Sequence, residues 1–160
     1  MNRLVSKVIF AGVALALLGA VQAQAQTNFF VAPGGIGTWE DPLNWTLGHV
    51  PTGTETATIP AAREAPGSSN VGTFTTLRLG DNNIATLNIA PGAVLGTTGQ
   101  SLMGLAGGGN GAVINHTGGS YTSGGTLFLG YADSNTANYT MSGNASLTAQ
   151  GAMFARFGNA

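Results

Sequence analysis

The feature that most constrains the fold is a repeat of roughly 26 residues, which runs from about Leu77 to the last residue. Each unit contains three phrases of about five residues in which apolar and small polar residues alternate, with Gly, Asn, Asp or Ser between the phrases. Leu95, Tyr121 and Leu147 end successive units at even spacing. The opening phrases lie at 77–80, 102–104 and 127–130, the middle phrases at 85–89, 112–116 and 137–141, and the closing phrases at 92–95, 119–121 and 145–147.

Alternation bounded by turn residues is the pattern of a β-strand. Three short strands that recur at a constant period predict one coil of a β-solenoid, and one coil cannot bury its inward face without neighbours. We therefore predict an all-β fold, a right-handed parallel β-helix with roughly 26-residue coils and an N-terminal tryptophan-containing cap, although the sequence does not determine the hand. The alternative, a disordered glycine-rich linker, would not carry Leu, Val, Ile and Phe in register.

The composition excludes several classes of function. The chain of 160 residues suits one domain, and a formal net charge of −1 with only 7% charged residues offers no basic surface for nucleic acid. There is no cysteine, which excludes a disulfide framework and a thiolate metal site. The 26 glycines suit a solenoid, whose corners use glycine and asparagine and whose outer faces are often threonine and serine.

Residues 1–25 have the pattern of a secretory signal peptide. Arg3 and Lys7 precede an apolar run over 8–20, and Ala23-Gln24-Ala25 forms a small-residue cleavage site. The run is shorter than the roughly 20 residues of a membrane span, and no second apolar segment follows it. We predict a secreted protein, extracellular or at the cell surface, that is cleaved after either alanine of this site and has no membrane span in the mature chain.

Residues 26–70 form a distinct stretch that holds both tryptophans, Trp39 and Trp45. Because the first coil of a solenoid has an unpaired edge and an open apolar end, we predict that 26–70 forms a cap with the first strands and that 71–160 forms the solenoid repeats. Within this stretch, 61–70 is expected to be a loop or an excursion from the first coil. The alternative for the tryptophans is a platform on which a sugar stacks.

The order of residues in the cap resembles the start of a known group of proteins. A tryptophan, an acidic pair and Asn-Trp occur at 39–45, and Gly-His-Val-Pro follows at 48–51, ahead of a first strand. This pattern and the later Leu-x-Leu-Gly units are similar to those of secreted bacterial β-helical repeat proteins, including relatives of autotransporter passengers and sorted exoproteins. The resemblance implies an architecture more than an activity, and such relatives usually continue into a sorting signal or a membrane segment.

No set of residues has the spacing of a catalytic or metal site. Polysaccharide-cleaving β-helices need clustered carboxylates that recur once per coil, whereas Asp81 and Asp133 are two coils apart. The run 107–111 is similar to a calcium-binding nonapeptide, but Val113 stands where the aspartate ligand is required. We predict no catalysis, no metal and no cofactor, and a structural role for His116 at a turn.

Two expectations concern charge and the end of the chain. Arg78 should point outward, beside Met103 and Phe128 in the ladder and without an ion pair. Residues 153–160 begin a fourth unit, with 154–158 in the place of 127–130, and an uncovered last strand is open to pairing with another chain. We predict the N-terminal part of a longer repeat protein or a truncated product, which associates end to end through this edge.

Together these patterns favour a secreted or cell-surface structural or adhesive β-solenoid module that is not an enzyme. The alternative is a carbohydrate-binding or polysaccharide-cleaving β-helix, with cell-surface or extracellular glycans as partners and with Trp39 and Trp45 as the binding residues. The outer faces discriminate between the two. Stacked acids and aromatic residues would favour the alternative, and uniform threonine, serine and asparagine would favour the structural module.

Overall fold

The structure is a computed structural model that describes residues 25–60, 64–67, 70–81, 84–105, 111–132 and 135–154, without the side chains of 64–67, 70 and 71. The predicted signal peptide up to residue 24 lies outside these ranges, as do most of the glycine run, Asp133 and 155–160.

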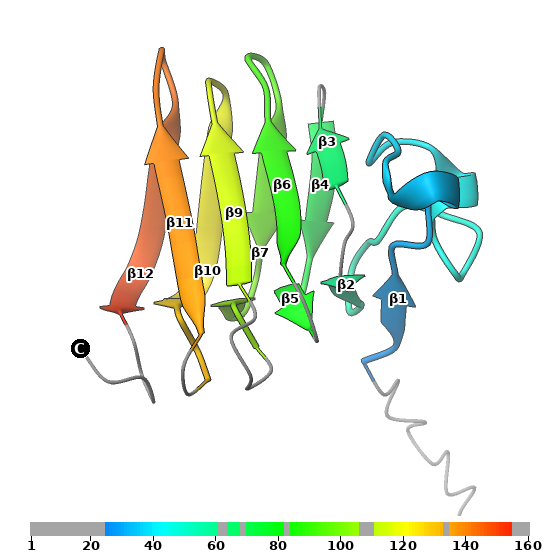
Figure 1. Ribbon diagram of the computed structural model, residues 1–160, viewed down its shortest axis with the longest axis horizontal. Coiled ribbons are helices and arrows are strands. Elements are labelled where there is room, and N and C mark those ends of the chain that lie inside the picture. Colours follow the sequence, from blue (N-terminus) through cyan, green and yellow to red (C-terminus); the bar gives the residue numbers. More distant parts are fainter. Residues whose placement is uncertain are drawn as a thin grey trace, which may run out of the picture.

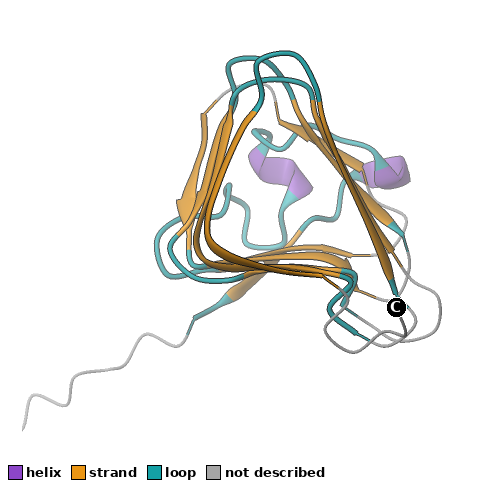
Figure 2. Ribbon diagram, turned by 90° about the vertical axis from the view of Figure 1, so that its left-hand side faces the viewer, coloured by secondary structure: helices purple, strands orange, loops and turns teal. Residues whose placement is uncertain are grey.

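The described chain winds into a three-sided stack of strands, seen from the side in Figure 1 and along its axis in Figure 2. The ladders between strands are parallel, so that each strand pairs with strands of the coils before and after it rather than with its neighbour in sequence. This arrangement confirms the prediction of an all-β parallel β-helix.

Each of the three faces is defined by the strands that stack in it. The first face contains β1 (Thr27–Phe29), β2 (Thr56–Pro60), β5 (Thr76–Asp81), β8 (Ser101–Met103) and the second halves of β10 (Ser120–Leu129) and β12 (Ser146–Phe154). The second face contains β3 (Glu64–Gly67), β6 (Ala85–Ile89), β9 (Gly111–His116) and β11 (Thr136–Met141). The third face contains β4 (Asn70–Phe74), β7 (Val94–Thr97) and the first halves of β10 and β12.

β10 turns the corner between the third and first faces without a break. Its first part pairs with β7 and its last part pairs with β8. Gly124 lies at the corner, where an added Cβ atom would come within 2.7 Å of the carbonyl oxygens of Thr97 and Thr98. The backbone of the preceding coil therefore leaves room at this corner only for glycine.

The register of the ladders confirms the repeat on all three faces. The sets that align are Leu95, Tyr121 and Leu147; residues 85–89, 112–116 and 137–141; and Leu79, Met103 and Leu129. The coil length varies, however, because Thr56 and Thr76 are partners 20 residues apart, whereas Tyr121 and Leu147 are 26 apart. Stacking thus preserves inward and outward positions while the corners absorb differences in length.

Two expectations from the sequence are wrong. Residues 61–70 are not simply a loop, because 64–67 form β3 and pair with 86–89 of β6. Stacking on the next coil overrides the weak strand propensity of this Pro- and Gly-containing segment. The fourth unit also begins earlier than predicted, with Phe154 opposite Leu129 rather than opposite Leu127, because β12 takes its corner with one residue fewer than β10.

The inward side chains form one continuous core. In β6, Ala85, Leu87 and Ile89 are buried, and the residues between them are partly exposed. Successive coils place equivalent side chains above one another, so that Leu87, Ile114 and Tyr139 form a column. Each large apolar side chain that is fully buried contributes about 1.5–3 kcal/mol, and most of that burial comes from the neighbouring coils.

Polar side chains replace apolar ones inside the corner that joins the third and first faces. Ser101 occupies the inward position that Leu77 has one coil earlier. Its hydroxyl lies 3.2 Å from that of Thr97 and 3.0 Å from that of Ser123, and it accepts a hydrogen bond from the Tyr121 phenol. Burial raises the pKa of Tyr121, so the phenol remains a donor and these hydroxyls satisfy one another.

The segment before β2 covers the N-terminal end of the core. Trp39 is fully buried and stacks on Phe74, with ring centroids 5.6 Å apart. Trp45 packs edge-on against Trp39 at 4.7 Å and Phe30 at 5.2 Å, and its indole N–H donates to the Trp39 carbonyl at 2.8 Å. The 3-10 turns of this segment are η1 (Pro33–Gly35) and η2 (Pro42–Asn44).

Trp45→Ala is expected to lower the free energy of unfolding by about 3 kcal/mol or more, because it removes a buried ring and an indole hydrogen bond. Leu43→Ala is the matched control, since Leu43 is 82% exposed and should change stability by less than about 0.5 kcal/mol. Chemical unfolding followed by circular dichroism measures both variants. Unchanged stability of Trp45→Ala would show that the aromatic cluster does not stabilise this end.

Gly119→Ala tests how closely the coils approach at the corner between the second and third faces. Gly119 has φ of 75°, and an added Cβ atom would overlap the carbonyl oxygen of Ala93 in the preceding coil. Gly92 has φ of 86° at the same corner one coil earlier, with open space where its Cβ would lie. Gly92→Ala should therefore cost about 1–2 kcal/mol for its backbone conformation alone, and Gly119→Ala clearly more. Equal losses in chemical unfolding would contradict the close approach.

Candidate functional site

A hollow of about 520 Å³ opens at the C-terminal end of the stack. No described strand pairs with the outer edges of β11 and β12. The inward side chains of this last described coil are therefore not covered by a further described coil, and the hollow lies over them. The hollow is therefore a cross-section of the core itself. Its lining residues are Leu127, Leu129, Ala137, Asn138, Tyr139, Met141, Leu147, Ala152 and Phe154.

The lining of this hollow is apolar and uncharged. Asn138 and Tyr139 are its only polar lining residues, and Phe154 stands at the rim with 73% of its surface exposed. Such a surface can bind another apolar surface, because burial removes its side chains from water. Its lining residues include no carboxylate and no imidazole, and the hydroxyl of Tyr139 is engaged by a buried histidine behind the hollow, His116.

His116 lies behind the hollow, on the inward side of β9. Its Nδ1 is 2.9 Å from the Tyr139 hydroxyl, and its Nε2 is 3.3 Å from the Gly119 carbonyl. Burial lowers the pKa of His116 because the imidazolium would lose its hydration, and hydrogen bonds to the backbone of Gly119 and Gly118 oppose this effect only in part. A neutral ring that accepts from Tyr139 and donates to Gly119 satisfies both contacts. The expected structural role agrees with this placement, although His116 lies in a strand rather than at a turn.

The segment between β1 and β2, which holds Trp39 and Trp45, lies at the opposite end of the stack from β11 and β12, which line the hollow (Figure 1). The structure brings the two indoles together, with exposed fractions of 0% and 2%. A sugar platform needs an aromatic face open to the ligand, and neither ring has one in this arrangement. The two side chains instead pack with Phe30 and Phe74 over the first coil.

The carboxylates with described contacts serve separate local interactions. Asp41 caps the turn η2, Glu55 pairs with His49 at 3.3 Å, and Asp81 pairs with Arg78 at 3.6 Å. Within the described ranges, no three His, Asp or Glu side chains gather in a way that could hold a metal ion. The structure therefore does not bring these carboxylates together into one site.

The surroundings of Arg78 differ from the expectation. Its ladder partner is Leu102 rather than Met103, with Phe128 one coil further, because the phrase in that unit begins with a serine one residue before Leu102. Arg78 also forms an ion pair with Asp81, which the sequence analysis excluded. Both side chains are partly exposed, so this pair contributes only about 0–1 kcal/mol.

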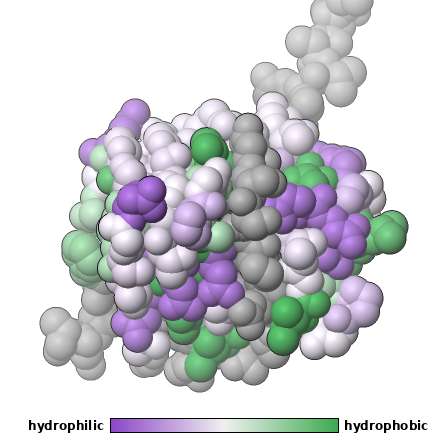
Figure 3. Space-filling view, turned by 90° about the horizontal axis from the view of Figure 1, so that it is seen from above, coloured by the Kyte–Doolittle hydropathy of each residue, from purple (hydrophilic) through white to green (hydrophobic). Residues whose placement is uncertain are grey.

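The outer sides of the second and third faces carry mainly short polar side chains, with Val113 and the exposed Val94 as apolar exceptions. On the second face, Asn88, Asn115 and Thr140 form a column in which the Asn115 amide donates to the Asn88 side chain at 2.8 Å. On the third face, Thr122 and Thr148 are exposed ladder partners. Figure 3 shows a surface that is mainly neutral or hydrophilic, with apolar residues in separate small patches.

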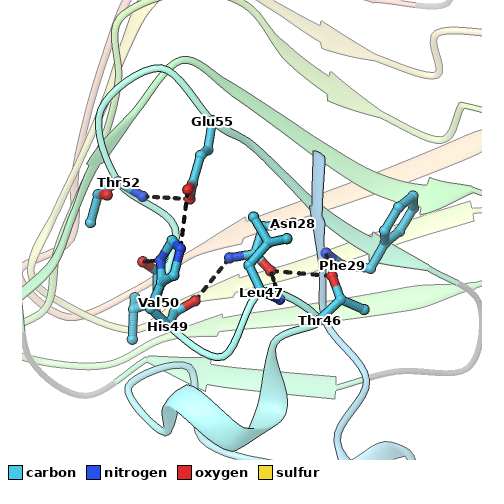
Figure 4. A network of polar contacts seen from close by, with 8 residues as sticks. All are labelled: Asn28, Phe29, Thr46, Leu47, His49, Val50, Thr52 and Glu55. Carbon is cyan, nitrogen blue, oxygen red and sulfur yellow. Dashed lines mark hydrogen bonds and ion pairs between the residues drawn. The ribbon is translucent and has the colours of Figure 1, made fainter. Parts of the chain in front are cut away.

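Asn28 is a structurally important residue that the sequence analysis missed. It lies inward in β1, is fully buried, and donates from its amide to the His49 carbonyl at 2.8 Å (Figure 4). Its Oδ1 accepts from the Leu47 N–H at 3.1 Å and from the Thr46 hydroxyl at 3.3 Å. The signal was available in the sequence, since Asn28 is a polar residue two positions before Phe30, in the same inward phase.

Comparisons of the chain with family models, with curated proteins and with solved structures return no match. None of the helices that the structure describes has the length and apolar character needed to cross a membrane. The resemblance to secreted β-helical repeat proteins therefore stays a prediction from the sequence.

Acidification should destabilise the protein through His116. Because burial lowers its pKa in the folded state, the unfolded chain binds the proton more readily below about pH 6.5, and stability falls as the pH drops below that value. One proton gives a slope of up to about 1.4 kcal/mol per pH unit. The neighbouring Tyr139 stays neutral in this range, since burial raises its pKa.

His116→Gln provides the control for this pH dependence, because a neutral amide can still contact Tyr139. Chemical unfolding between pH 5 and pH 7.5 should show a shallower fall in stability for the variant than for the wild type. If both proteins lost stability in parallel over this range, another group would be responsible.

Proposed function

We propose that the protein is a secreted, non-enzymatic β-solenoid module with a structural or adhesive role outside the cell or at its surface. The observation that supports this best is the character of the second and third outer faces. Both carry columns of threonine, asparagine and serine in ladder register, such as Asn88, Asn115 and Thr140. Short neutral side chains that repeat at the strand spacing form an extended contact surface, whereas catalysis needs a few reactive groups gathered in one site.

Several polar groups of the described residues that could serve an enzyme are engaged in the fold. His116 bridges Tyr139 and a backbone carbonyl, and the Ser101 hydroxyl contacts other buried hydroxyls inside a corner. Asp81 pairs with Arg78 at the surface. These contacts stabilise the coils, and this structural role is enough to explain why the polar groups are there.

The proposal of secretion rests on the sequence. A positive start, an apolar run over 8–20 and the site Ala23-Gln24-Ala25 are typical of an exported chain. The low charge and the high content of Gly, Thr, Ser and Asn suit an extracellular repeat protein.

The competing function is a β-helix that binds or cleaves carbohydrate, with extracellular glycans as partners. Such a protein needs an aromatic ring open to the sugar and, for cleavage, a pair of carboxylates. The two tryptophans are buried, and Phe128 on the outer side of the first face packs edge-on against Tyr131 at 5.3 Å and is itself buried. Two described aromatic rings are exposed, those of Phe29 and Phe154, but they lie on β1 and β12 at opposite ends of the stack and do not form one platform. This separation favours the structural role.

Expression of the full chain in a bacterial host tests both parts of the proposal. We expect the protein in an extracytoplasmic fraction, with a mature N-terminus at Gln24 or Gln26 by mass spectrometry. The purified protein should release no reducing ends from pectin, alginate or neutral glucans. Retention of an uncleaved chain in the cytoplasm would contradict secretion. Depolymerisation that is lost in Asp81→Asn would contradict the non-enzymatic role.

A pair of matched variants separates an adhesive role from a purely structural one. Thr122→Glu with Thr148→Glu places two charges on the third outer face, where both residues are exposed. Thr38→Glu with Thr54→Glu places the same charges at exposed positions of the cap. If the third face is adhesive, attachment of protein-coated beads to cells or matrix should fall several-fold for the first pair of substitutions and stay unchanged for the second pair. If both double variants attach as well as the wild type, the third face is not adhesive and the structural role remains.

A further inference from the structure

The strands at the C-terminal end of the stack lack the features that usually protect an exposed edge. β11 has six residues and β12 has nine, and no other described strand pairs with their outer edges. Natural edge strands are usually protected by charged side chains or proline, yet residues 136–154 contain no Asp, Glu, Lys, Arg or Pro. Exposed Met141, Met153 and Phe154 lie on these two strands, beside the hollow of about 520 Å³.

On its first and third faces, the N-terminal end of the same stack is closed by its own chain. The outer edge of β1 is met by an antiparallel segment, in which the Thr46 N–H donates to the Phe29 carbonyl at 2.9 Å and the Phe29 N–H donates to the Thr46 hydroxyl at 3.0 Å. On the third face, the Gly53 N–H donates to the Thr73 carbonyl at 3.0 Å. In head-to-tail stacking, the C-terminal strands of a second copy would have to pair with these backbone groups. Because the groups are already hydrogen-bonded, this arrangement is disfavoured.

We propose that the C-terminal end of the stack binds the same end of a second copy, so that two solenoids meet end to end about a two-fold axis. Seen from its own C-terminal end, each copy runs around the triangle in the same sense. When two such ends face each other, the senses oppose, and every strand meets its partner antiparallel. One side of the triangle then pairs with the same side of the other copy, and the remaining two sides pair crosswise.

The chemistry of this end suits a contact with itself. In a two-fold contact each patch meets its own copy, so a charged patch would meet a like charge. No charged residue lies between 136 and 154, and the apolar lining of each hollow meets the apolar lining of the other. Phe154, 73% exposed at the rim, becomes buried against the second copy. The inference does not depend on the extracellular role proposed above.

The mass of the purified full-chain product, measured by sedimentation over a range of concentrations, tests this proposal. We expect a monomer–dimer equilibrium that stops at the dimer. Phe154→Glu should weaken dimerisation by at least about a hundredfold, because it would bury one unpaired charge from each copy in the interface. Leu43→Glu, which adds the same charge at an exposed apolar residue of the cap, should leave the dimer unchanged. Circular dichroism confirms that both variants fold.

Three results of this measurement would overturn the proposal. A monomer at all concentrations would show that nothing binds this end. Oligomers that grow without limit and are lost in both variants would show head-to-tail stacking instead. A dimer that persists in Phe154→Glu would place the interface elsewhere.

Single cysteines provide an independent test, because the chain has no cysteine of its own. Asn138→Cys, Thr148→Cys and Met153→Cys each mark one side of the triangle at an exposed outward position. Under mild oxidation, the two-fold contact predicts that one variant cross-links rapidly to itself and that the other two cross-link to each other when mixed. Thr54→Cys in the cap is the control and should not cross-link. A set in which no variant cross-links to itself would contradict the two-fold axis.

Discussion

Backbone hydrogen bonding between successive coils is the interaction on which the rest of this structure depends. Strands as short as Ser101–Met103 would not hold their conformation alone, yet they stack in register because each coil presents donors and acceptors to the next. This pairing brings like positions above one another and so builds the column of Leu87, Ile114 and Tyr139. It also brings backbones so close at the corners that Gly124 has no room for a Cβ atom.

A structure held together in this way has two ends with unsatisfied backbone groups, and the chain treats them differently. At the N-terminal end, an antiparallel segment and the side chain of Asn28 satisfy the edge of β1, while Trp39 and Trp45 cover the core. At the C-terminal end, the core borders an uncharged hollow that no described strand covers. The faces between the ends are neutral and repetitive, so the features of the molecule that favour interaction are its polar faces and its open end.

Polar residues inside the solenoid are tolerated because the coils also align their side chains. Ser101 replaces an inward leucine without an unpaired hydroxyl, since Thr97, Ser123 and Tyr121 lie within reach. His116 is held in the same way by Tyr139 on the next coil. Such groups specify the register more than they add stability, because a slip by two residues would keep them inward but separate them from these partners.

The sequence by itself determined the fold class and the register of the later coils, because the alternation of residues 85–89, 112–116 and 137–141 is a local signal that stacking repeats. The sequence also indicated that Trp39 and Trp45 belong to the same N-terminal segment. It did not predict β3, the early start of the fourth unit or the ion pair of Arg78, because these depend on how coils of unequal length align at the corners. Only the tertiary structure decided that Asn28 pairs with backbone groups at one end and that no described strand covers the other, since both depend on which backbone groups remain unpaired after the coils have stacked.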